Sequence, residues 1–457
     1  MRIHRSLVAL VCFALGFLCI QLYMVKYVSW NDNKHLSIVE ISHDPSEVSE
    51  ALAVQSYINI QHFARICASR SMVVTLIEPS ILTRIVNKEN KAAKCRYLCI
   101  KETVTTFSIM GNNLHEAALV EEMEKEKFTV IPVLHKDPRH LSLLTGKAEK
   151  ISTHFIFLRN FHVIHLVVFY ERQGGFLWHG PVRFKMQSRN VIERLKFDAK
   201  LLRFGHYPGA YDTFDTAEVT IDSVTFRAPR YPKKFLDQIP HARFIECNYT
   251  RAQEFYRLHS KDNGEEAEAF REAAAGVVRR GKAYLDSIGV RFWMSSGTCL
   301  GWFRQCDIIP YSKDVDFGIW IKDYNEKLMP TFEENSMPIK HVFGKVADSF
   351  ELSFQSDDVK LDMFFFYEEE EYMWNGGTQA KTGKKFKYFF PKFTLCWTSF
   401  LDLKIRIPCE TLSYIEANYG TNWFTPVTEW DWKQSPPNVR ENGVWPQDEW
   451  DEVIQLL

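Results

Sequence analysis

Three aspartates in the second half of the chain have the spacing of a divalent-cation site. Asp314 and Asp316 flank Val315 in an apolar segment, and alternate side chains of a strand share one face, so both carboxylates would point the same way. Asp362 lies in VKLDMFFFYEE (359–369), an apolar run typical of a buried strand, where an unpaired carboxylate is costly. If the two strands are neighbours, the three acids converge. Adjacent carboxylates repel unless a cation lies between them, and hard oxygen ligands favour Mg²⁺ or Mn²⁺.

An isolated Asp-x-Asp is more often a solvated surface pair, and the buried third acid is what favours a metal site here. Two other segments could contact a phosphate. SSGT (295–298) follows an apolar run, and Gly297 permits a backbone conformation that other residues resist, so a phosphate could approach closely. A Gly-containing segment (375–393) carries several lysines, among them Lys384 and Lys385. We interpret it as a loop that holds a diphosphate, with a solvated basic turn as the alternative.

The elements around these residues predict an α/β (α+β) fold. Apolar residues recur at three-to-four spacing over 264–287, which predicts a helix that ends at Gly289, and a strand is expected at 290–294. In the first half, apolar runs at 72–77 and 164–170 predict further strands between helical segments. Helices and strands therefore alternate in both halves of the chain.

The two halves also resemble each other in sequence. Four pairs of segments match in the same order: 72–82 with 290–300, 164–171 with 361–368, 178–180 with 374–376, and 224–229 with 403–408. In this overlay Pro79 corresponds to Gly297, and His165 corresponds to Asp362. We therefore hypothesise that residues 51–250 are a degenerate copy that keeps the sheet and has lost the carboxylates. Coincidence among apolar strands is the alternative.

Bulk composition excludes one class of partner. The chain has 457 residues, with 56 Lys and Arg against 57 Asp and Glu, so no basic surplus indicates nucleic-acid binding. Its length leaves room for two or three domains.

The N-terminus predicts a membrane anchor. Residues 7–25 are largely apolar and uncharged, which is long enough for a transmembrane helix. Arg2 and Arg5 precede them, and the positive-inside rule then places the N-terminus in the cytosol and the rest of the chain in the lumen, as in a type II protein. A cleaved signal peptide is the alternative. The predicted organisation is a cytosolic tail (1–6), a single transmembrane helix (7–25), a stem (26–50), a lumenal non-catalytic α/β domain (51–250) and a catalytic domain (251–457).

Cysteines and one sequon fit a lumenal location. Eight cysteines follow the apolar segment, so some disulfides are expected, with several buried free thiols as the alternative. The pairing cannot be read from the sequence. Cys95 and Cys99 have no partner pair at zinc-finger spacing. Asn248 begins an Asn-Tyr-Thr sequon and is a candidate site of N-glycosylation.

Longer stretches carry a family resemblance. SGTCLGWFRQCDIIPYSKDVDFGI (296–319), LDMFFFY (361–367) and IPCETLSYIEANYGTNW (407–423) resemble the LicD phosphotransferase family. The resemblance implies a nucleotidyltransferase-like catalytic domain with a mixed sheet, acting on cytidine-diphosphate donors. The family motif falls on the following positions of this chain: Gly297, Arg304, Asp307, Asp314, Asp316 and Asp362. Where many members have an acid before the aspartate pair, this chain has Ser312 and Lys313, which leaves a fourth carboxylate in doubt.

One branch of the family is similar over nearly the whole length, including the ending at 435–456. That similarity implies metal-dependent transfer of ribitol 5-phosphate from CDP-ribitol to the phosphorylated O-mannosyl glycan of α-dystroglycan in the Golgi, with release of CMP. The partners could include a complex with fukutin-related protein and an O-mannose N-acetylglucosaminyltransferase. Arg304 and Asp307 would then contact the donor, Arg304 having a structural ion pair as its alternative. Asp362 would be a metal ligand or a general base.

Two rival functions remain compatible with the sequence. A sugar-transferring glycosyltransferase also uses Asp-x-Asp and a metal, but it does not require the small turn or Asp362. A non-catalytic Golgi scaffold or chaperone for other glycan-modifying enzymes would leave the three acids unexplained.

Overall fold

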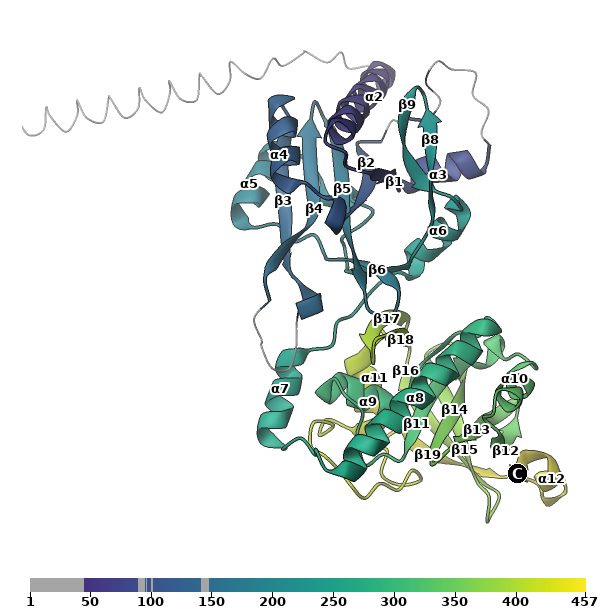
Figure 1. The fold of residues 1–457 in the computed structure, drawn as a ribbon. Coiled ribbons are helices and arrows are strands. Elements are labelled where there is room, and N and C mark those ends of the chain that lie inside the picture. The colour runs from purple at the N-terminus through teal and green to yellow at the C-terminus, as the bar shows by residue number, and fades with distance from the viewer. Residues whose placement is uncertain (1–44, 89–94, 96, 100–101, 141–147) are drawn as a thin grey trace, which may run out of the picture.

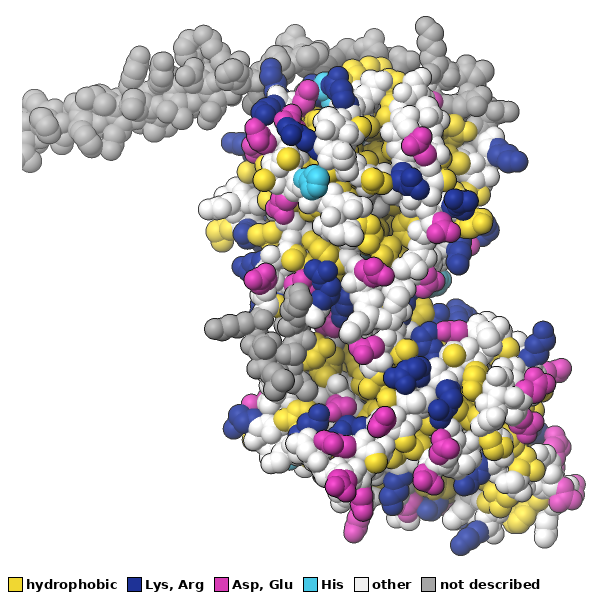
Figure 2. Space-filling model, viewed as in Figure 1, with side chains coloured by type: hydrophobic (Ala, Val, Ile, Leu, Met, Phe, Trp, Pro, Cys, Tyr) yellow, Lys and Arg dark blue, Asp and Glu magenta, His cyan; other side chains and the backbone are white. Residues whose placement is uncertain are grey.

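The computed structural model describes residues 45–457 apart from 89–94, 96, 100–101 and 141–147. The described chain forms two units, each built around one nine-stranded sheet, and the units lie one beyond the other (Figure 1). Both combine helices with mixed sheets, which confirms the α/β (α+β) prediction. On the face drawn in Figure 2, basic and acidic side chains are interspersed over both units.

The first unit has the strand order β3-β4-β5-β2-β1-β9-β8, with β6 and β7 continuing from β5. Its strands are β1 (Val74–Leu76), β2 (Val104–Met110), β3 (Thr129–Lys136), β4 (Lys150–Arg159), β5 (His162–Arg172), β6 (Phe176–His179), β7 (Gly209–Asp212), β8 (Thr216–Ile221) and β9 (Val224–Pro229). Its helices are α2 (Pro45–Ser69), α3 (Pro79–Val86), α4 (Glu116–Lys125), α5 (Met186–Arg194) and α6 (Pro232–Gln238). Helix α2 packs on the sheet through Ile60, Phe63 and Cys67, which recur at helical spacing. Strand β5 is buried along most of its length, which explains its near-continuous apolar run.

Helix α7 (Tyr249–Leu258) leads into the second unit, whose strand order is β19-β16-β15-β14-β13-β12-β20, with β11 pairing β14 and β10 pairing β11. Its strands are β10 (Phe292–Met294), β11 (Asp314–Trp320), β12 (Ile339–Lys345), β13 (Asp348–Ser356), β14 (Val359–Glu368), β15 (Tyr372–Gln379), β16 (Lys384–Pro391), β19 (Val439–Val444) and β20 (Ile454–Leu456), and β17 (Leu395–Phe400) and β18 (Leu403–Pro408) form a separate hairpin. Its helices are α8 (Glu265–Ser287), α9 (Ser296–Gln305), α10 (Leu328–Glu334), α11 (Thr411–Tyr419) and α12 (Trp450–Val453).

Helix α8 confirms the predicted helical period. Val277, Val278 and Leu285 are fully buried on the sheet, and the chain leaves the helix at Gly289 with a φ of 71°, as the predicted stop requires. A Cβ at Gly281 would lie 2.9 Å from the Phe317 ring. The missing side chain at Gly281 therefore lets α8 approach the strand that carries the aspartate pair.

The two units repeat one topology, which supports the hypothesis of a degenerate copy. In each, a long helix precedes a short strand that pairs antiparallel with the next strand (β1 with β2, β10 with β11). That second strand pairs in parallel with a later one (β2 with β5, β11 with β14). The hairpins β8–β9 and β17–β18 also share one register, each joined by a two-residue turn in which both residues have positive φ.

The register places individual residues in correspondence. Ile77 N donates to Thr106 O at 3.1 Å, and Ser295 N donates to Asp316 O at 3.0 Å, at the same point of each unit. Thr106 pairs with His165 across β2 and β5, as Asp316 pairs with Asp362 across β11 and β14. The first unit therefore has threonine and histidine where the second has the two buried carboxylates.

Apolar side chains cover part of the corresponding sheet face of the first unit. Val104 on β2 and Val163 on β5 pack against Ile192 of α5 and Leu202. The first unit thus has a similar strand topology, with apolar packing over part of the face on which the second unit carries its acids.

The fold prediction was wrong in its single transmembrane helix. Among the residues that the structure describes, no helix has both the length and the hydrophobicity to cross a bilayer. The two longest, α2 and α8, are amphipathic: each packs one face on its sheet, and charged side chains occupy the rest of α8. The predicted tail (1–6) and anchor (7–25) lie outside the described residues. Helix α2 begins at Pro45, within the segment predicted as the stem (26–50).

The cysteines include both disulfides and free thiols. The described pairs are Cys95–Cys99, Cys247–Cys306 and Cys396–Cys409, while Cys67 and Cys299 are buried free thiols. Both alternatives drawn from the sequence therefore hold for different cysteines. The pair Cys247–Cys306 ties the chain before α7 to the end of α9.

Buried histidines in the first unit predict acid sensitivity. His154 Nδ1 lies 3.0 Å from His165 Nε2, and His154 Nε2 lies 2.7 Å from Gly180 O. Burial lowers the pKa of His165 to about 3 and that of His179 to about 4. The unfolded chain, with histidine pKa values near ~6.5, binds these protons first as the pH falls. Stability is therefore lost between pH ~6.5 and ~3, at up to about 1.4 kcal/mol per pH unit for each histidine.

The measurement is the free energy of unfolding in urea at several pH values between about 4.5 and 6.5. His165→Leu should flatten the dependence, whereas the exposed His241→Leu should leave it unchanged. Equal slopes in wild type and His165→Leu would contradict the assignment of acid sensitivity to this cluster.

Candidate metal centre

The three predicted aspartates converge, because β11 runs parallel to β14 in the register that sets Asp316 opposite Asp362. One carboxylate oxygen from each of Asp314, Asp316 and Asp362 lies within 4.8 Å of the others. Asp316 is 6% exposed and Asp362 is 4% exposed. The site is thus formed by two neighbouring strands, and its acids are held away from bulk water.

The start of α9 supports Asp316. Thr298 N donates to Asp316 Oδ2 at 3.3 Å, and Asp316 N donates to Thr298 Oγ1 at 2.8 Å. The positive end of the helix dipole therefore lies at a carboxylate. A Cβ at Gly297 would lie 3.3 Å from Asp316 Oδ2, so a larger residue would crowd this carboxylate.

The sequence predicted that Gly297 has the unusual backbone conformation in this turn. The residue with the unusual backbone is Ser296, with a φ of 38°, and not Gly297. Gly297 is required for the space it leaves beside Asp316. Both features place the first turn of α9 against the site.

The three carboxylates of the site repel one another. Burial, together with the Asp362 carboxylate, raises the pKa of Asp314 to about 6. Burial, Asp314 and Asp362 raise the pKa of Asp316 well above its ordinary value. Neighbouring carboxylates thus disfavour the charged forms of Asp314 and Asp316, a repulsion that a bound cation would relieve. Such an oxygen-rich group fits a hard divalent ion such as Mg²⁺ or Mn²⁺.

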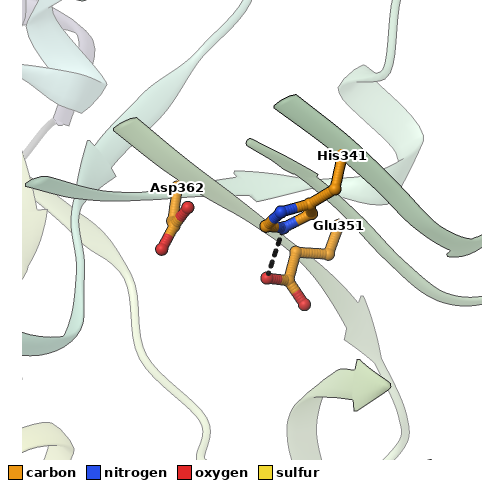
Figure 3. Close-up of side chains that lie close together, drawn as sticks. All are labelled: His341, Glu351 and Asp362. Carbon is orange, nitrogen blue, oxygen red and sulfur yellow. Dashed lines mark hydrogen bonds and ion pairs between the residues drawn. The ribbon is translucent and has the colours of Figure 1, made fainter. Parts of the chain in front are cut away.

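Asp362 has further partners that the sequence analysis missed. Ser353 Oγ donates to Asp362 Oδ1, and Lys360 Nζ lies 2.7 Å from Oδ2. Glu351 and His341 follow on the next two strands, with His341 Nε2 3.3 Å from Glu351 Oε1 (Figure 3). Lys360 could have been found from alternation, because it stands two residues before Asp362. His341 and Glu351 depend on strand register, which the sequence does not reveal.

The hydroxyl of Tyr419 is another missed group. It lies at the end of α11, and a Cβ at Gly297 would be 3.9 Å from it. Burial, then Asp316, raise the pKa of this phenol well above its ordinary value, so it stays protonated beside the acids. The ring of Trp430 packs on Tyr419 with centroids 5.0 Å apart.

Two predicted donor contacts lie away from the acids. Arg304 is 2% exposed at the far end of α9, where it donates to Gln305 Oε1 at 2.8 Å and stacks on the Phe255 ring at 4.6 Å. A rise of 1.5 Å per residue puts it roughly 10 Å along the helix from Gly297. Asp307 pairs with Lys261 at 3.2 Å. Both residues stabilise the end of α9 and do not face the aspartates.

The predicted phosphate-binding loop is a β-hairpin. Lys384 and Lys385 begin β16, where Lys384 pairs with Glu441 at 3.2 Å and Lys385 with Asp348 at 2.7 Å. The loop interpretation was therefore wrong, because alternating aromatic residues make this segment a strand. Asn248 is exposed and caps α7 by accepting a hydrogen bond from Arg251 N at 3.0 Å.

Comparison with known proteins identifies the family to which this chain belongs. The family profile described as Fukutin N-terminal matches residues 2–275, and the profile described as LicD/FKTN/FKRP, nucleotidyltransferase domain, matches residues 289–410. The human protein "Ribitol-5-phosphate transferase FKTN" is 45% identical over 469 residues, covering 100% of this chain and 99% of that protein. The mouse protein of that name is 47% identical over 87% of each chain.

Another relative matches only a short stretch of the chain. Human "Ribitol 5-phosphate transferase FKRP" is 46% identical over 55 residues, covering 12% of this chain and 10% of that protein. The acids Asp314, Asp316 and Asp362 all lie within the nucleotidyltransferase match. On the full-length similarity and both profiles, this chain belongs to the fukutin family.

Proposed function

We propose that this chain is a metal-dependent ribitol-5-phosphate transferase that acts in the Golgi lumen. The donor is CDP-ribitol, the acceptor is the phosphorylated O-mannosyl glycan of α-dystroglycan, and CMP is released. The observation that carries the proposal is the convergence of Asp314, Asp316 and Asp362 in the nucleotidyltransferase domain of a chain 45% identical to a protein named ribitol-5-phosphate transferase.

The chemistry is transfer of one ribitol-phosphate group, which forms a phosphodiester with the acceptor. An acceptor hydroxyl oxygen forms a bond to the ribitol-side phosphorus of CDP-ribitol, and the bond from that phosphorus to the CMP oxygen breaks. CMP leaves with the electron pair, and the hydroxyl proton passes to solvent. Asp314, Asp316 and Asp362 would hold Mg²⁺ or Mn²⁺, which neutralises charge on the diphosphate.

The side chains around the metal-binding acids have separate roles in this proposal. Asp362 offers a carboxylate oxygen within 4.8 Å of oxygens of Asp314 and Asp316 and also contacts Ser353 and Lys360, so we assign Asp362 as a metal ligand. Lys360 and the first turn of α9 present positive charge and backbone N–H groups toward the donor phosphates. Tyr419 offers a neutral hydroxyl donor beside Asp316.

The first unit has a different role in this proposal. Among the described residues, both groups able to hold a metal lie in the second unit. We therefore assign the first unit to recognition of the glycoprotein or of partner enzymes, including the complex expected with fukutin-related protein and an O-mannose N-acetylglucosaminyltransferase. Three disulfides and the exposed sequon at Asn248 support a lumenal location and its N-glycosylation.

A panel of donors tests the proposed substrate. The purified full-length chain is mixed with Mn²⁺, a phosphorylated O-mannosyl glycopeptide and CDP-ribitol, CDP-glycerol or CDP-choline, and CMP is quantified. We expect CMP release with CDP-ribitol, only when the acceptor is present and EDTA is absent. Equal release from all three donors would contradict ribitol specificity, and release without acceptor would indicate a hydrolase.

A further inference from the structure

A second group of possible metal ligands adjoins the first. His341 on β12, Glu351 on β13 and Asp362 on β14 each offer an atom, and these atoms lie within 4.8 Å of one another. Figure 3 shows the three side chains on the same side of adjacent strands. Asp362 belongs to both this group and the aspartate group, so two cations would share one carboxylate.

We propose that His341, Glu351 and Asp362 bind a second divalent cation, bridged by Asp362 to the ion at Asp314 and Asp316. The proposal rests on the proposed function and extends its metal requirement from one ion to two. In two-metal sites a pair of ions about 3.5–4 Å apart holds both the attacking and the leaving oxygen of a displacement. The bridging position of Asp362 is suited to that spacing.

The chemical types of these ligands indicate which divalent ion would bind. One imidazole nitrogen and two carboxylates favour Mn²⁺ or Zn²⁺ over Mg²⁺, which binds oxygen ligands. The His341 ring is held in place by stacking on Phe343, with centroids 4.2 Å apart, and its Nε2 points at Glu351. The imidazole is thus oriented in advance, as a metal ligand requires.

Burial and charge also favour a cation. The side chains of His341 and Glu351 are each 12% exposed, and that of Asp362 is 6% exposed. Four carboxylates, those of Asp314, Asp316, Glu351 and Asp362, gather around the one lysine, Lys360, that pairs with Asp362. A single divalent ion leaves this group with excess negative charge, which would repel a donor diphosphate. A second ion makes the site attractive to the diphosphate.

The fold itself does not require an acid at position 351. By strand register, Glu351 and Asp362 correspond to His154 and His165 of the first unit. There His154 Nδ1 lies 3.0 Å from His165 Nε2. The scaffold is therefore stable with neutral groups at both positions, so the His341–Glu351 pair calls for an explanation beyond packing.

Manganese binding without donor or acceptor tests the proposal. The untagged full-length chain is dialysed against Mn²⁺, bound metal is measured by mass spectrometry, and the electron paramagnetic resonance spectrum is recorded. We expect about two Mn²⁺ per chain and a spectrum of exchange-coupled ions, as for a two-metal site. Glu351→Gln and His341→Gln should each leave about one Mn²⁺, uncoupled.

Matched variants separate the two positions. Asp316→Asn should lose the first ion and keep an uncoupled ion at His341, whereas the exposed His241→Gln should behave as wild type. Glu351→Gln is nearly isosteric, so it serves if His341→Gln does not fold. One Mn²⁺ in wild type, or two that persist in Glu351→Gln, would overturn the second site. Neither outcome affects the proposed transfer, which CMP release measures separately.

Discussion

Asp316→Asn is expected to lower acceptor-dependent CMP release by about 10²–10³-fold, the scale set by loss of one electrostatic contact that stabilises a transition state. Asp316 is buried and belongs to the group of three carboxylates that could hold a metal ion. The same change should stabilise the metal-free protein, because an amide removes the repulsion that Asp314 and Asp362 exert on this carboxylate. The measurements are CMP release with Mn²⁺ and thermal unfolding in EDTA.

The pH dependence of the stability of the metal-free protein tests the same repulsion independently. The folded-state pKa of Asp314 is raised to about 6, so the metal-free fold loses stability as the pH rises from about 4 through 6, where the unfolded chain ionises first. Asp307→Asn is the matched control, since Asp307 pairs with Lys261 away from the acids. Activity that survives in Asp316→Asn, or is lost equally in Asp307→Asn, would contradict the assignment of the site.

Trp293→Ala should cost about 3–5 kcal/mol of unfolding free energy, the usual range for a large buried aromatic. Trp293 is fully buried on β10, with ring centroids 4.6 Å from Trp320 and 5.0 Å from Phe366. It lies over Gly318, where a Cβ would come within 2.3 Å of its ring. Because β10 pairs with the strand that carries Asp316, activity should fall with stability.

Urea unfolding followed by circular dichroism measures that loss. Trp430→Ala is the control of the same residue type, since Trp430 is 39% exposed and surface changes usually alter stability by less than about 0.5 kcal/mol. Equal losses in the two variants would show that Trp293 is not the centre of this core.

The aspartate site could be predicted because alternation and burial are local signals. Asp314 and Asp316 face one way in any strand, and the apolar residues around Asp362 identify a buried strand. Convergence of the three acids also requires that the two strands are neighbours. The parallel pairing of β11 with β14 confirms that they are. The overlay of the two halves was predictable for the same reason, since short apolar strands kept their order.

Contacts that depend on register or on helix phase could not be predicted. Arg304 belongs to the family motif, yet its position just over two turns into α9 directs it to Phe255 and Gln305. The lysines of 375–393 resembled a loop because glycines interrupt them, whereas cross-strand pairing makes the segment a hairpin. His341 and Glu351 come from strands on the far side of Asp362, a relation that no spacing in the sequence encodes.

Product analysis tests the central claim most directly. The full-length chain is incubated with CDP-ribitol, Mn²⁺ and the phosphorylated O-mannosyl glycopeptide, and the glycopeptide is weighed by mass spectrometry, in parallel with Asp316→Asn. We predict that the wild-type product gains one ribitol phosphate and that the variant product stays unmodified. An unmodified glycopeptide with folded, metal-loaded wild type, or a modified one with Asp316→Asn, would contradict the account.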